Sequence, residues 1–218
     1  MIRKTTAVLA ILSVLAGCAE EGGSRGSGVS TAIEGNLVRI ESASNSSAVL
    51  ARVSSSVAGV EVAVEGSSAK GTTDAAGHFS LHGYFYGPIE VIFSRSSDGL
   101  LARLAVKIPA GGTLTLADVS VDASQQQAVA ASQEIQCEAK ITATSCSSET
   151  LTMASAFQGS GAESEDYVVH LDTSTVRDAA GHPVSCADLS VGQRAMVQAS
   201  VEADGSFRNA TIEIEGQS

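Results

Sequence analysis

The chain has 218 residues, enough for two small domains, and carries 24 acidic against 13 basic side chains, a formal net charge of −11. A surface of that sign argues against nucleic acid and against anionic lipid headgroups as binding partners. Tryptophan is absent, and runs rich in Val and Thr, broken by Gly, Asn and Asp without a sustained helical period, predict an all-β chain.

The N-terminus has the pattern of a bacterial export signal. Two basic residues precede an apolar run at 7–15 that is too short to span a bilayer permanently. The sequence Leu15-Ala16-Gly17-Cys18 that ends this segment resembles the bacterial lipobox. The resemblance implies that residues 1–17 are a signal peptide and that Cys18 becomes the lipidated, acylated N-terminus. The alternative is an ordinary secretory signal with a coincidental cysteine.

Lipidation of Cys18 would hold the protein at a membrane, because several acyl chains bind where one binds only reversibly. In such lipoproteins an Asp after the cysteine favours the inner membrane. Ala19 stands there instead, so we expect an outer-membrane location. Removal of residues 1–17 leaves 11 basic against 24 acidic side chains, a net charge of −13. Residues 18–30 are small, polar and rich in Gly, which predicts a flexible tether.

Residues 31–122 have the pattern of a β-sandwich. The run Val60-Glu61-Val62-Ala63-Val64-Glu65 alternates strictly and places its valines on one face, as in a half-buried strand. Clusters of Gly, Asp and Ser then separate further runs of strand composition. Their spacing favours a seven-stranded type of sandwich, with strands near 33–40, 48–53, 60–65, 78–82, 88–95, 100–108 and 113–121.

The stretch "GVEVAVEG…GTTDAAGHFSL" within this region resembles the carboxypeptidase regulatory-like domain, a transthyretin-like β-sandwich. The shared features are the G-V-x-V-x-V strand and a T-D-x-x-G-x-F hairpin, here Thr73, Asp74, Gly77 and Phe79. The resemblance covers residues 58–122 well and the preceding strands poorly. It implies a non-catalytic scaffold module that assists folding, tethering or contacts with partners.

Three of the eight aromatic residues follow one another at Tyr84-Phe85-Tyr86. Strand alternation predicts that Phe85 faces the core while both tyrosines face the other way. One interpretation is a flat surface, formed by Tyr84 and Tyr86, that stacks on a sugar or a partner protein. The other is ordinary packing with phenol groups at the water boundary, which the sequence favours because no carboxylate cluster accompanies the tyrosines.

Residues 123–134, rich in Gln, Ala and Ser, are predicted to form a linker or one short helix between two units. Residues 135–216 alternate again. Asp204-Gly205 is a strong hairpin signal between the last two of their strands. Five strands suit a small OB-like barrel, and we expect them at 134–144, 149–155, 166–176, 192–205 and 206–215.

The stretch from Val169 to Glu215 resembles a family of small bacterial barrels known as a domain of unknown function. Its markers are an A-D-L-x-V-G run at 187–192, A-D-G at 203–205, and the residues Asp172, Thr175, Val176, Ala210 and Ile212. The resemblance implies an exported β-barrel module and carries over no activity. Related barrels carry cysteines at the strand–loop edges where Cys146 and Cys186 lie.

Three cysteines remain once Cys18 is lipidated. Because an exported protein meets an oxidising environment, we predict a Cys146–Cys186 disulfide and a free, buried thiol at Cys137. The alternative is a zinc site that also uses His170 or His182. No pair of cysteines has C-x-x-C spacing, so we predict no metal ligands.

The sequence DAAGH occurs at Asp74–His78 and again at Asp178–His182, between unrelated flanks. The two copies are read as independent turns, with a paired Asp/His site as the alternative. No nucleophile–base set, metal cluster or phosphate loop is recognised, so we predict a non-enzymatic protein without cofactors. Its partners would be the membrane, through Cys18, and other envelope proteins, with strand addition at an exposed sheet edge as one mode. The alternative function is glycan or small-ligand binding, at Tyr84 and Tyr86 or on the face of the barrel.

Overall fold

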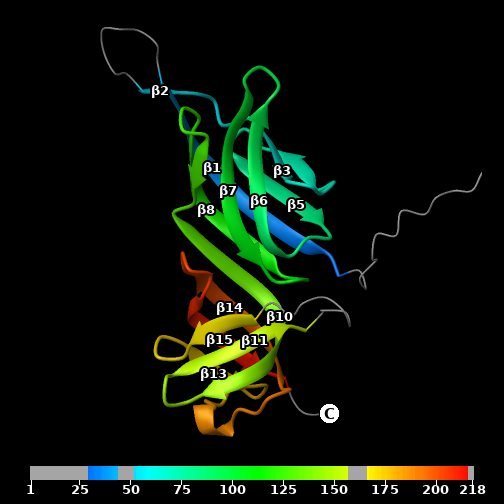
Figure 1. The fold of residues 1–218 in the computed structure, drawn as a ribbon, viewed down its shortest axis with the longest axis vertical. Coiled ribbons are helices and arrows are strands. Elements are labelled where there is room, and N and C mark those ends of the chain that lie inside the picture. Colours follow the sequence, from blue (N-terminus) through cyan, green and yellow to red (C-terminus); the bar gives the residue numbers. More distant parts are fainter. Residues whose placement is uncertain (1–28, 44–51, 157–165, 216–218) are drawn as a thin grey trace, which may run out of the picture.

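The structure is a computed structural model that describes residues 29–43, 52–156 and 166–215, and its regular structure is all-β (Figure 1). The fold class predicted from composition is therefore confirmed. In these ranges the one helical element is a 3-10 turn at Cys186–Asp188. The strands are β1 (Thr31–Ala43), β2 (Arg52–Ser54), β3 (Glu61–Val64), β4 (Lys70–Thr72), β5 (His78–Gly83), β6 (Gly87–Arg95), β7 (Gly99–Ile108), β8 (Thr113–Asp122), β9 (Gln127–Val129), β10 (Ser132–Ser145), β11 (Thr150–Ser155), β12 (Asp166–His170), β13 (Thr175–Asp178), β14 (Arg194–Val201) and β15 (Phe207–Ile214).

Several predicted features lie outside the described residues. They are the signal peptide at 1–17, Cys18 with most of the tether, and most of the strand expected at 48–53. The described end of that strand is β2, which pairs with the C-terminal end of β1. None of the described segments forms a helix long and apolar enough to span a bilayer.

The N-terminal half is a sandwich of two sheets, with β3, β6 and β7 in front of β1, β5 and β8 in Figure 1. One sheet has the order β4-β3-β6-β7, and in the other β1 lies between β5 and β8. The two layers are in direct contact, because the ring of Phe79 on β5 meets Phe93 on β6 edge to face with 5.8 Å between centroids. Ile33 and Leu81 are fully buried in the same core.

The C-terminal half is a closed five-stranded barrel with the order β10-β11-β12-β15-β14 and back to β10. This is the small-barrel architecture predicted for 135–216. One element differs, because the single strand expected at 166–176 is divided into β12 and β13. β12 meets β15 only at the pair Val169 and Phe207, and β13 then pairs with the end of β15 from Thr211 onward.

The segment 123–134, expected as a linker or a short helix, contains strand structure instead. β9 pairs with the end of β8, and β10 begins at Ser132. The first residues of β10 pair with β8 of the sandwich, and from Glu134 onward β10 also pairs with β14 of the barrel. A single strand thus belongs to both halves, and backbone hydrogen bonds join them in addition to the chain itself.

Side chains reinforce this connection. The Ser155 hydroxyl donates a hydrogen bond of 2.7 Å to the carbonyl of Ala110, in the turn between β7 and β8. Lys107 of the sandwich places its ammonium 4.7 Å from the ring centroid of Tyr167 in the barrel, a cation–π contact. The two halves therefore meet through specific contacts on β7, β8 and β10.

Candidate functional site

Tyr84, Phe85 and Tyr86 form the loop between β5 and β6. Phe85 is 6% exposed, whereas Tyr84 is 77% and Tyr86 51% exposed. The alternation predicted from the sequence is confirmed, with the phenylalanine in the core and both tyrosines in water. These tyrosines are among the few large exposed side chains of apolar character in the described part of the chain.

The residue before this loop, Gly83, is closely packed. A Cβ added to Gly83 would lie 3.0 Å from the Cβ of Ala69 and 3.1 Å from the Phe85 ring, so the position accepts little beyond glycine. Gly83 also pairs with Thr31 at the start of β1. The aromatic loop therefore lies at the end of the sandwich where the chain enters it.

A groove with a volume of about 760 Å³ lies where the sandwich meets the barrel. Its sandwich wall includes Pro88, Glu90, Ala105 and Lys107, and its barrel wall is the turn between β14 and β15, at 201–205. The acidic side chains of this lining are Glu65, Glu90, Glu202 and Asp204, against a single lysine. The groove was not predicted from the sequence, because its two walls come from separate units.

Ion pairs neutralise part of this acidic lining. Arg103 reaches Glu65 at 2.7 Å and Glu90 at 2.6 Å, and the hydrogen bond from Arg103 lowers the pKa of the Glu65 carboxyl. On the other wall, hydrogen bonds from Ser206 lower the pKa of Asp204. Asp204 is therefore ionised near neutral pH, and Arg103 pairs with neither Glu202 nor Asp204 of this lining.

The edge of β7 lines this groove. The Arg103 N–H donates to the carbonyl of Gln126, so it points away from β6. Backbone groups two residues apart on a strand point the same way, which aims the Ala105 N–H away from β6 as well. Ala105 is exposed, and the pairing of β7 with β9 is confined to Arg103 and Gln127. On the neighbouring strand β6, Pro88 is paired with Lys107 of β7. Pro88 is near the start of β6, where a residue without a backbone N–H is tolerated.

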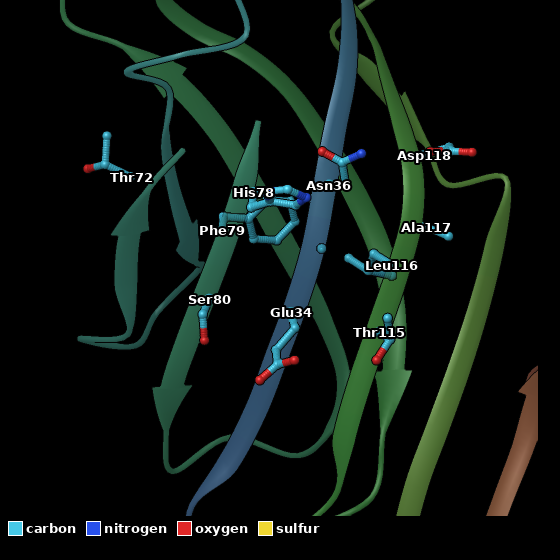
Figure 2. A pocket seen from close by; sticks show the side chains of 11 residues that line it. Glu34, Asn36, Thr72, His78, Phe79, Ser80, Thr115, Leu116, Ala117 and Asp118 are labelled. Carbon is cyan, nitrogen blue, oxygen red and sulfur yellow. The ribbon is translucent and has the colours of Figure 1, made fainter. Parts of the chain in front are cut away.

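A second, shallower depression of about 640 Å³ lies on the outer face of the β5-β1-β8 sheet (Figure 2). Figure 2 shows Glu34, Asn36, His78 and Ser80 on it, with the Phe79 ring beside the backbone of β1. A Cβ at position 35 would lie 2.4 Å from that ring, so only Gly35 allows it to lie there. The polar groups here are dispersed, and the described residues nowhere bring three or more His, Cys, Asp or Glu side chains together to hold a metal ion.

The two DAAGH segments adopt the same turn. In each, the aspartate Oδ1 accepts hydrogen bonds from the backbone N–H two and four residues later, at 2.8 and 2.9 Å for Asp74 and 2.9 and 2.8 Å for Asp178. The histidine Nδ1 lies 3.5 Å from Asp74 Oδ2 and 3.2 Å from Asp178 Oδ2. Both aspartates have a lowered pKa. The largest cause is the hydrogen bond from the backbone N–H of His78 to Asp74 and from that of His182 to Asp178. Each Asp–His pair thus finds its hydrogen-bond partners within its own turn.

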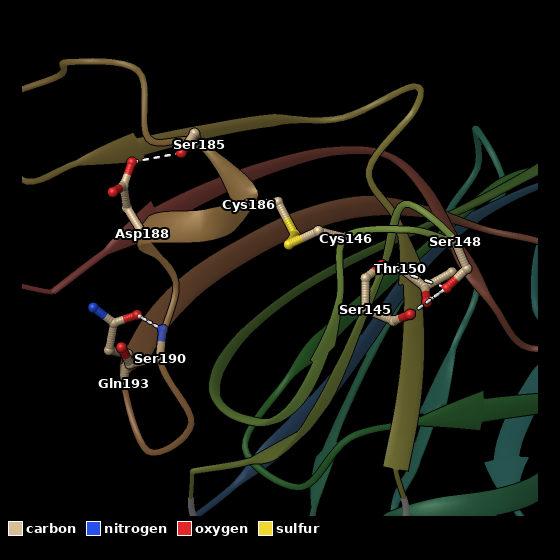
Figure 3. Close-up of a disulfide and its surroundings, with 9 residues drawn as sticks. All are labelled: Ser145, Cys146, Ser148, Thr150, Ser185, Cys186, Asp188, Ser190 and Gln193. Atoms are coloured by element: carbon tan, nitrogen blue, oxygen red, sulfur yellow. Dashed lines mark hydrogen bonds between the residues drawn. A yellow bond between two sulfur atoms is a disulfide. The ribbon is translucent and has the colours of Figure 1, made fainter.

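The predicted disulfide is present between Cys146 and Cys186, with 5.6 Å between their Cα atoms (Figure 3). It links the turn between β10 and β11 to the 3-10 turn before β14. Figure 3 shows that Ser145, Ser148 and Thr150 form a hydroxyl cluster on one side of it. Cys137 is free and buried, as predicted, and burial raises the pKa of its thiol to about 12.

Comparison with protein-family models gives no match for this chain, and comparison with the curated proteins gives none either. The lipobox and both family resemblances therefore stay predictions from the sequence. Among the described residues, Tyr84 and the disulfide belong to different halves and form no common site, and Cys18 lies outside the described residues.

Proposed function

We propose that the chain is an exported, lipid-anchored module of the bacterial cell envelope that binds other envelope proteins and catalyses no reaction. The Cys146–Cys186 disulfide supports export, because such bonds persist in oxidising compartments. The lipobox pattern ending at Cys18 supports the anchor, and Ala19 supports the outer membrane. Binding is the function that the groove beside β7 supports best.

The observation that carries this proposal is the edge of β7 at Ala105, which lies beyond the single pairing with β9 and lines a groove about 760 Å³ in volume. A strand edge is a template for an added strand, and main-chain hydrogen bonds then provide affinity without requiring one sequence. The partner would lie extended along β7, between the sandwich and the 201–205 turn. Glu202 and Asp204 on that turn favour a basic side chain in the partner.

Cross-linking in intact cells tests the proposal, followed by identification of the captured proteins. We expect the lipidated protein to capture one or a few envelope proteins, and Cys18→Ser to lose them. Ala105→Pro should also lose them, because proline removes the donor at the edge without touching the hydrogen bonds to β6. The matched control Ala105→Ser keeps the N–H and should keep the partners.

A second variant protects this test against a folding defect in the proline variant. Glu202→Lys reverses one charge of the groove and should weaken capture, whereas Glu213→Lys, on an exposed site of β15 outside the groove lining, should not. Equal capture by the two Ala105 variants, Glu202→Lys and Glu213→Lys would overturn the assignment of the groove as the binding site. Equal solubility of the Cys18→Ser and unchanged proteins would overturn the anchor.

The exposure of Tyr84 and Tyr86 favours a second candidate function, the binding of a glycan. Planar aromatic side chains in water bind sugar faces by stacking. A glycan binder should lose affinity in the double variant Tyr84→Ala/Tyr86→Ala. Unchanged affinity of that variant in a glycan-binding assay would dismiss this site.

A further inference from the structure

The aromatic loop shares one end of the sandwich with the start of the described chain. Thr31, the first residue of β1, pairs with Gly83 just before the loop, and its hydroxyl accepts a hydrogen bond of 3.1 Å from the N–H of Gly111. Thr31 therefore lies between the β5–β6 loop and the β7–β8 turn. A chain that leads from a membrane anchor to Thr31 therefore joins the sandwich beside Tyr84 and Tyr86.

The β5–β6 loop with its flanks, residues 83–89, contains no charged residue. The acidic side chains at this end of the sandwich include Glu65 and Glu90, and Arg103 pairs with both. At the opposite end, Asp74 and Asp98 lie in the turns after β4 and β6, and Asp122 ends β8. The loop that carries the exposed tyrosines thus adds no charge of its own, which lowers the cost of approaching a lipid surface.

We infer that Tyr84 and Tyr86 contact the lipid bilayer and hold the uncharged β5–β6 loop against the membrane surface. This inference rests on the proposed anchor at Cys18. Tyrosine suits the boundary between lipid and water because its ring is apolar and its hydroxyl is polar. The uncharged loop and the acidic remainder of the molecule favour zwitterionic over anionic lipid.

Because the segment between Cys18 and Thr31 is short, a weak contact between the tyrosines and lipid is sufficient to orient the protein. Residues 19–30 separate Cys18 from Thr31, and a chain of this length in any conformation spans at most roughly 45 Å. Lipidation of Cys18 would therefore keep the tyrosines within that distance of the bilayer. A second contact made within such a tether forms at high effective concentration, so two tyrosines with low intrinsic affinity are enough to orient the protein.

The absence of tryptophan from the sequence makes the contact directly measurable. A Tyr84→Trp variant carries a single indole at the proposed contact. The matched control is Val129→Trp, because Val129 is 65% exposed on β9, which pairs with the end of β8 near the aspartate-bearing turns. Each lipidated, full-length variant is reconstituted into phosphatidylcholine vesicles with and without brominated lipid, and co-sedimentation is measured on the same samples.

We expect both variants to co-sediment with the vesicles. The indole at position 84 should emit at shorter wavelength than in the Cys18→Ser form and should be quenched by brominated lipid, while the indole at position 129 should change in neither respect. Tyr86→Ala, added to Tyr84→Trp, should reduce the quenching. A vesicle-bound protein whose indole at position 84 is unquenched, or quenched no more than that at position 129, overturns the inference but leaves the anchor standing.

Two other outcomes also decide the question. Failure to co-sediment refutes the anchor, and with it the inference. An emission change at position 84 in the Cys18→Ser form on addition of soluble peptidoglycan fragments, without any change on vesicles, assigns the tyrosines to a glycan and overturns the bilayer contact.

Discussion

Burial decides the chemistry of Cys137. Its side chain lies on the inward face of β10, in line with Ile135 and Ala139, and is 3% exposed. The loss of water around the sulfur raises the pKa of the thiol to about 12, so the thiol is protonated throughout the physiological range. Because the thiolate is the reactive form of cysteine, this residue is expected to be inert in the folded protein.

A thiol-labelling experiment on the non-reduced protein tests that expectation. In the Cys18→Ser form at about pH 8, the native protein should react with no more than a trace of reagent, and denaturant should release one thiol per chain, since Cys146 and Cys186 are paired. Adding Cys137→Ala to that form should leave no thiol to release. Rapid labelling of the native protein would contradict the burial of Cys137, and more than one released thiol would contradict the disulfide.

The DAAGH turns provide a pH dependence at the same scale. Hydrogen bonds in the folded protein lower the pKa of Asp74 and Asp178 from the usual 3.8. An aspartate of this kind stabilises the fold above its unfolded pKa, and the contribution disappears as pH falls through the lower folded value. Asp74→Asn should therefore reduce the Tm more at about pH 6 than at about pH 3. Asp178→Asn repeats the experiment in the other half, and a Tm loss independent of pH in both would contradict the mechanism.

At the scale of elements, alternation was the informative signal. The strands that correspond to β3 and β5–β8 were predicted close to their observed positions, because each buries one face and exposes the other. The short strands β4 and β9 were missed, since three residues carry too little pattern to be distinguished from a turn. The parallel pairing of β1 with β8 was not predicted either, because side-chain alternation is the same for both strand directions.

The disulfide makes a large expected contribution to the free energy of unfolding. It closes a loop across a sequence separation of 40 residues, and the chain-entropy relation for that length gives about 4 kcal/mol. Cys146→Ser/Cys186→Ser should lower the free energy of unfolding by up to that amount in urea titrations. Reductant should destabilise the unchanged protein to a similar extent and leave the double variant unaffected. Equal stability with and without reductant would show that the bond contributes nothing.

The whole molecule depends on contacts that no local pattern contains. The outward direction of Tyr84 and Tyr86 followed from alternation, and the Cys146–Cys186 pair followed from the export reasoning and the resembling barrels. The groove could not be predicted, because Ala105 and the 201–205 turn come from halves whose relative placement depends on β10. The length of β10 was hidden by its composition, since the small polar residues before it resemble a linker.

A cavity substitution in β10 tests whether the two halves unfold together. Ile135 is 1% exposed and pairs with Leu114 of the sandwich and Ala199 of the barrel. Ile135→Ala should cost about 2–5 kcal/mol, and hydrogen exchange should accelerate in both β6–β7 and β14–β15. Ile212→Ala, fully buried in β15 alone, is the matched control and should act mainly on the barrel. Acceleration in the barrel alone for both variants would show independent units.

The shared strand also gives the protein a vulnerable period during its own synthesis. The chain grows from its N-terminus, so the sandwich is complete as far as β8 before β10 exists. Until residues 132–136 arrive, the edge of β8 at 113–117 has no partner and can pair with another chain. A fragment that ends at residue 131 would keep this edge open permanently and should form dimers or larger aggregates, whereas in the full chain residues 132–136 cover it and β11 and β14 pair with the rest of β10. Size-exclusion chromatography of the fragment and the full chain would show whether the start of the barrel protects the open edge of the sandwich.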